Sequence, residues 1–106
     1  MTDKIVVLST CASAEEAEKV ARRLVEQRLA ACVNVMPGVR SYYRWKDAIE
    51  SAGEWLLVIK SSRDLFPRLR VELEAVHSYE VPELVAVPIV DGAPNYLNWL
   101  DNELHE

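Results

Sequence analysis

The sequence predicts a small α+β domain with elements in the order strand, helix, strand, strand, helix, strand. Two observations predict this class: short segments rich in β-branched or aromatic residues, and two segments whose apolar residues recur at helical intervals. The chain has 106 residues, half of them hydrophobic, which is typical of one domain with a single core. We therefore expect one domain over residues 1–106.

The first strand and helix have clear local signals. Residues 4–9 (KIVVLS) are apolar and rich in β-branched side chains, as in a strand covered on both faces. Ser13 stands three residues before Glu16, the spacing of a capping box. A helical stripe follows, made of Ala17, Val20, Ala21, Leu24 and Val25. We expect a helix over about residues 14–28.

The next part of the chain predicts a long hairpin. Residues 31–36 read as a strand that ends at the turn dipeptide Pro37–Gly38. Residues 39–45 are aromatic and β-prone, residues 46–53 are polar, and residues 54–60 are again strand-like. The simplest interpretation is a hairpin arm with a polar tip.

The last third supplies a helix, a strand and a terminal helix. The second helix carries Pro67 in its first turn, where a missing N–H costs little, and runs to about Val76. Residues 84–90 form the last strand, and Pro88 indicates an edge or a bulge. A short helix over residues 94–104 follows. This order is the ferredoxin-like, split βαβ arrangement: an antiparallel sheet with both main helices on one face.

Several strands are apolar on both faces, which an antiparallel sheet covered on one side does not require. The pattern occurs in residues 6–8, 55–59 and 84–87. A chain this short has no spare element to cover a second apolar face, so we expect other copies of the chain to cover it. The aromatic arm, with Tyr42, Tyr43 and Trp45, is the natural piece to reach a neighbour.

Composition narrows the classes of partner. The formal net charge is −5 with charges interspersed, so there is no basic stripe for nucleic acid. No apolar run approaches the roughly 20 residues of a membrane span, and the first residues lack the features of a secretory signal. We expect a soluble, cytoplasmic protein with no membrane partner. Cys11 and Cys32 are too few for a disulfide framework, and Cys32 is expected in the core.

Signatures of catalysis are missing from the sequence. A nucleophile beside a base, a carboxylate pair in a cleft or a phosphate-binding loop would point to an enzyme. The chain has only three glycines and none of these motifs. We expect a protein that is not an enzyme.

Several motifs, in order, resemble one known family. They are residues 29–38 (LAACVNVMPG), 41–45 (SYYRW), 59–60 (IK), 77–84 (HSYEVPEL) and 96–100 (YLNWL). Over residues 5–100 the chain resembles CutA, the divalent-ion tolerance proteins. The resemblance implies a ferredoxin-like subunit in a homotrimer similar to PII signalling proteins, a cytoplasmic location in bacteria, and a role in copper or other divalent-metal tolerance.

The resemblance also implies a copper site, from which this sequence departs. In some members it uses a cysteine in the first strand and two adjacent histidines before the last strand. Here Ser9 and Val76 stand at the cysteine and first-histidine positions, and Ser78 replaces a proline. His77 alone carries over, with Cys11 on the same strand face as Ser9 if the strand continues. Any copper or other divalent metal is therefore expected to bind weakly, at His77 with Cys11.

Two interpretations of the site residues remain open. His77 either binds a metal or donates to the last carbonyls of its helix. Glu80 and Glu83 either complete a metal site of hard carboxylate ligands or are solvated. The candidates for an inter-subunit ligand cleft are Trp45, Lys60, Tyr79, Glu80, Glu83 and Trp99. The simpler role for the aromatic residues among them is packing, since aromatic side chains are favoured at interfaces for their area alone. The leading hypothesis is a trimer that binds a metal or small ligand at its subunit junctions. The alternative is a PII-like signalling hub that docks an unidentified protein and has no intrinsic metal site.

Overall fold

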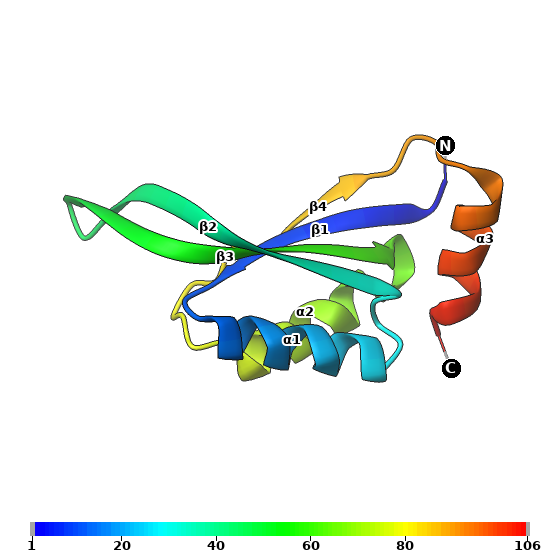
Figure 1. Ribbon diagram of the computed structural model, residues 1–106, viewed down its shortest axis with the longest axis horizontal. Helices are drawn as coiled ribbons and strands as arrows, with labels where there is room; N and C mark the ends of the chain where they lie inside the picture. The colour runs from blue at the N-terminus through cyan, green and yellow to red at the C-terminus, as the bar shows by residue number, and fades with distance from the viewer. Residues whose placement is uncertain (1, 106) are drawn as a thin grey trace.

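The computed structural model describes residues 2–105, and its elements follow the predicted order (Figure 1). The strands are β1 (Lys4–Cys11), β2 (Cys32–Trp45), β3 (Ala48–Ser62) and β4 (Val85–Pro88). The helices are α1 (Ala14–Glu26), α2 (Phe66–Val76) and α3 (Pro94–Glu103), with a short 3-10 turn, Arg63–Leu65, before α2.

The four strands form one sheet in the order β2-β3-β1-β4, and all neighbours pair antiparallel. Helices α1 and α2 lie together on one face of this sheet (Figure 1). The core fills the space between that face and the two helices, and its fully buried residues include Val7, Leu57, Ile59, Leu24 and Leu73. The predicted ferredoxin-like α+β fold is confirmed.

The prediction that Pro37–Gly38 ends the second strand is wrong. Strand β2 continues through a bulge between Met36 and Val39, where Gly38 has a φ of 81°. Because β2 is the outer strand of the sheet, a proline and a bulge are tolerated there. The polar stretch 48–53 also pairs with β2, so the expected loop shrinks to Lys46–Asp47, both with positive φ.

Other predicted boundaries shift by a few residues. Strand β1 extends past Ser9 to Cys11, and α1 ends at Glu26 because Arg28 takes a left-handed φ of 58°. Strand β4 is shorter than expected and lies at the sheet edge, with Pro88 as its last residue, as the proline predicted.

Helix α3 closes the end of the sheet that lies opposite the tip of the β2–β3 hairpin (Figure 1). Its Leu100 is fully buried and anchors the helix to the core cluster. Over residues 2–105, no helix combines the length and the apolar character that a membrane crossing requires.

The sheet face opposite the helices is apolar and open. The pairing register puts Val6, Leu8 and their neighbours on this face. Its most exposed members are Met36 (45%), Val85 (49%) and Val87 (46%). Cys32, opposite Lys60 in the register, is on this face and only half-buried in a single chain, so its predicted place in the core is wrong.

We expect the protein to sediment as an oligomer, because a single copy leaves this open face in water. Val87→Lys puts a charge on the face and should lower the sedimentation coefficient or leave the chain unfolded. Val71→Lys is the matched control, since Val71 is 66% exposed on α2. Analytical ultracentrifugation would contradict the prediction if the parent were fully folded at the single-chain mass of 12.0 kDa.

Candidate functional site

Three potential metal ligands meet where β1 ends. Cys11, the last residue of β1, lies near Glu16 in the first turn of α1 and His77 at the end of α2. Their ligand atoms all lie within 4.8 Å of one another. The His77 side chain is fully buried, and that of Glu16 is 13% exposed. The cluster is therefore shielded from solvent by its own elements.

Both ring nitrogens of His77 already have hydrogen-bond partners. Nδ1 accepts the backbone N–H of Tyr79 at 3.1 Å, which leaves Nε2 to carry the proton and donate to the Thr10 carbonyl at 2.7 Å. The Cys11 sulfur lies 3.8 Å from Nε2. Of the two roles left open for His77, donation to the carbonyls of its own helix is not observed, because the ring reaches across to Thr10 of β1.

Glu16 connects the cluster to the start of α1. Ser13 Oγ accepts the backbone N–H of Glu16 at 3.1 Å, which is one of the two hydrogen bonds of the predicted capping box. Its carboxylate accepts the backbone N–H of Ser78 at 2.9 Å and, more weakly, that of Ala12 at 3.4 Å. Burial alone would raise the pKa of Glu16, but these hydrogen bonds outweigh burial and hold the pKa below its usual value.

The Cys11 thiol holds its proton strongly. Burial raises its pKa to about 12, and the nearby carboxylates of Glu16 and Glu54 add to this effect. Since a thiolate is the form that binds a metal, this cysteine is a reluctant ligand at neutral pH.

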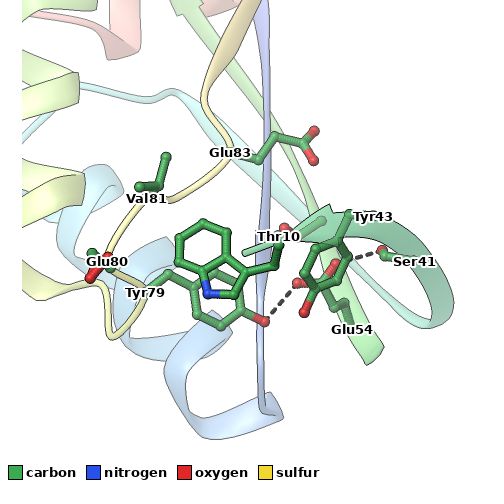
Figure 2. Close-up of a pocket in the computed structure, with 9 residues that line it drawn as sticks. Thr10, Ser41, Tyr43, Glu54, Tyr79, Glu80, Val81 and Glu83 are labelled. Atoms are coloured by element: carbon green, nitrogen blue, oxygen red, sulfur yellow. Dashed lines mark hydrogen bonds between the residues drawn. The ribbon is translucent and has the colours of Figure 1, made fainter. Parts of the chain in front are cut away.

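A pocket of about 300 Å³ lies next to the cluster, and Figure 2 shows the residues that line it. One wall is the hairpin arm, from Ser41 to Trp45 at the end of β2, and the other is the segment that follows α2. The lining residues are Thr10, Ser41, Tyr43, Trp45, Glu54, Tyr79, Glu80, Val81 and Glu83. Tyr79 belongs to both sites, since its ring lies 4.8 Å from that of His77. The cluster and the pocket are therefore neighbours.

Glu54 is the polar centre of the pocket. It is only 8% exposed, and its two oxygens accept hydrogen bonds from Ser41 Oγ at 2.5 Å and Tyr79 Oη at 2.6 Å (Figure 2). Burial and the Glu54 carboxylate both raise the pKa of Tyr79. These bonds tie the arm to the segment after α2 across the pocket.

The structure brings together some of the predicted cleft residues and separates others. Trp45, Tyr79, Glu80 and Glu83 line the pocket. Lys60 bonds Asn34 on the neighbouring strand instead. Trp99 stacks on Tyr96 within α3, 5.8 Å between ring centroids. Within one chain these two residues lie outside the pocket, because α3 is at the far end of the sheet from the arm (Figure 1).

Neither Glu16 nor Glu54 was predicted to belong to these sites. Glu16 had a complete explanation as a capping residue, so nothing marked it as a potential ligand. Glu54 stands first in a strand-like run, where an acidic residue is normally solvated. The one sequence signal for Glu54 was its position as a charged residue directly before the apolar run 55–59.

Tyr79→Phe should lower the free energy of unfolding by about 1–3 kcal/mol, because it leaves a buried carboxylate oxygen of Glu54 without its donor. Since folding raises the pKa of Tyr79, this contribution is complete below about pH 10 and is lost as the pH rises further. Urea denaturation of both proteins at several pH values measures it. Tyr42→Phe, at a tyrosine of β2 that is 70% exposed, is the control. No difference between Tyr79→Phe and the parent at neutral pH would contradict the prediction.

Comparison with known proteins covers nearly the whole chain. The family described as CutA1 divalent ion tolerance protein matches residues 5–103. The divalent-cation tolerance protein CutA of Thermus thermophilus is 48% identical over 95 residues, which is 90% of this chain and 92% of that protein. The chloroplastic protein CutA of Arabidopsis thaliana is 43% identical over 98 residues, which is 92% of this chain. The Arabidopsis protein is longer, and the match covers 54% of its length.

The fold agrees with solved structures as well. The structure of the "periplasmic divalent cation tolerance protein CutA" from Archaeoglobus fulgidus superposes with a TM-score of 0.93 at 38% identity, covering 96% of this chain and 99% of that one. The family match, the sequence identity and the fold thus agree with one another, and the chain belongs to the CutA1 divalent ion tolerance family.

Proposed function

We propose that this chain is a single-domain subunit of a non-enzymatic homotrimer that acts in divalent-metal tolerance and binds a divalent metal weakly at His77. Family membership supports the role in tolerance. The observation that carries the metal site is the convergence of Cys11, Glu16 and His77 within 4.8 Å. The apolar open face supports assembly of several copies, and the resemblance to PII-like trimers supports three.

The donor set fits copper or zinc in type. A thiol, an imidazole and a carboxylate are ligands that Cu²⁺ and Zn²⁺ accept, and three protein ligands leave a position for water. Cys11, Glu16 and His77 would hold the ion, and a bound ion there would change the local charge rather than drive a reaction. Ser9 takes no part, because its Oγ donates to the Glu83 carbonyl at 2.7 Å.

The same geometry explains why binding should be weak. A metal must displace the thiol proton of Cys11, whose pKa is raised to about 12. It must also free one nitrogen of His77 from Tyr79 or Thr10. Both costs oppose metal binding, so affinity falls well below that of a preformed site.

A second candidate function is a PII-like signalling hub without a metal site. The fully hydrogen-bonded ring of His77 favours it, because such a ring is a sufficient structural reason for a buried histidine. In that case an exposed element such as the arm would dock an unidentified protein. A cytoplasmic location belongs to both proposals, although the Archaeoglobus fulgidus relative is described as periplasmic.

Calorimetric titration with Cu²⁺ and Zn²⁺ tests the metal site. We expect saturable uptake with a dissociation constant of about 1 μM or weaker. His77→Ala should abolish it and Cys11→Ser should weaken it. His105→Ala is the matched control, because His105 pairs with Asp64 on the surface, away from the cluster. Uptake should rise with pH, since protons compete for the same lone pairs.

The outcomes separate the two candidates. If His77→Ala binds metal as the parent does, the site lies elsewhere, and Glu80 and Glu83 are the next to substitute. If the assembled parent takes up no metal at any pH, the metal site is excluded and the hub is favoured.

A further inference from the structure

We propose that the pocket beside Glu54 binds a small organic cation that carries N–H donors, such as a protonated amine or a guanidinium. This inference concerns a different site from the metal cluster and does not require metal binding. The pocket volume of about 300 Å³ is at the lower end of the range for small-molecule sites. A ligand of a few carbon atoms is therefore the appropriate size.

The charge of the pocket favours a cation. Its lining includes three carboxylates, on Glu54, Glu80 and Glu83, and no basic side chain. The Glu54 carboxylate is buried and already accepts two hydrogen bonds. Within residues 2–105, the side chains of Glu80 and Glu83 make no salt bridge, and both residues are exposed. These two carboxylates are thus available to accept N–H groups.

Aromatic rings supply the second part of the argument. Tyr43, Trp45 and Tyr79 line the same space, and aromatic faces attract cations through their negative quadrupole. The Trp45 ring already lies near a cation, since the Lys46 ammonium is 6.0 Å from the ring centroid. Lys46 is not a lining residue, and its single charge leaves the lining net negative.

The arrangement suits an organic cation better than a bare metal ion. Among residues 2–105, the group of three acidic, histidine or cysteine donors that converges on one point is Cys11, Glu16 and His77. The pocket carboxylates form no such group. A cation that carries several N–H groups on a carbon chain can contact separated carboxylates and ring faces together.

Calorimetry of the assembled protein with 1,5-diaminopentane at low salt tests this proposal. The probe carries two ammonium groups at neutral pH. Its controls of equal chain length are 1,5-pentanediol, which is neutral, and glutarate, which is anionic. We expect one diamine per pocket and no measurable uptake of the diol or of glutarate.

Substitutions locate the binding. Glu83→Gln and Trp45→Leu should each weaken diamine binding about five-fold or more. The matched control is Glu18→Gln, on the surface of α1 with a 73% exposed side chain. It should bind the diamine as the parent does.

Cys11→Ser separates this proposal from the metal site, since it should weaken metal uptake and leave diamine binding unchanged. The proposal is overturned if the diamine does not bind, if the diol binds equally well, or if both pocket variants bind like the parent. Uptake of Mn²⁺ at the pocket in place of the diamine would also overturn it.

Discussion

The pairing of β1 determines how the rest of the molecule is arranged around it. On one side β1 pairs with β3 along its whole length, from Lys4 to Cys11. On the other side it pairs with β4 only from Ile5 to Leu8. The backbone of the last three residues of β1, Ser9 to Cys11, needs other partners on that edge, because buried carbonyl groups must be hydrogen-bonded. The segment after α2 supplies them.

Both candidate sites follow from this incomplete pairing. His77 donates to the Thr10 carbonyl, and Ser9 donates to the Glu83 carbonyl, so the segment is tied to β1 at both ends. Its side chains are thereby placed beside Cys11 on one side and beside the arm on the other. Had β4 begun three residues earlier, the ladder would have occupied the edge of β1 that these contacts use.

The sequence predicted elements whose signals are local and missed features that depend on distant partners. The Ser13–Glu16 spacing located the start of α1 because a capping box lies within one turn. Pro37–Gly38 was misleading, since the same dipeptide serves a turn or a bulge, and only pairing with β3 decides between them. The site roles of Glu16 and Glu54 depend on contacts 62 and 25 residues away in sequence, which no local pattern encodes.

The hairpin arm extends beyond the helices (Figure 1), and a two-stranded ribbon is marginally stable on its own in water. Three lining residues of the pocket, Ser41, Tyr43 and Trp45, lie on this arm. Contacts from a neighbouring copy would therefore order the arm and the pocket wall in one step. Ligand occupancy and self-association would then be thermodynamically linked, so that each promotes the other and both decline together on dilution.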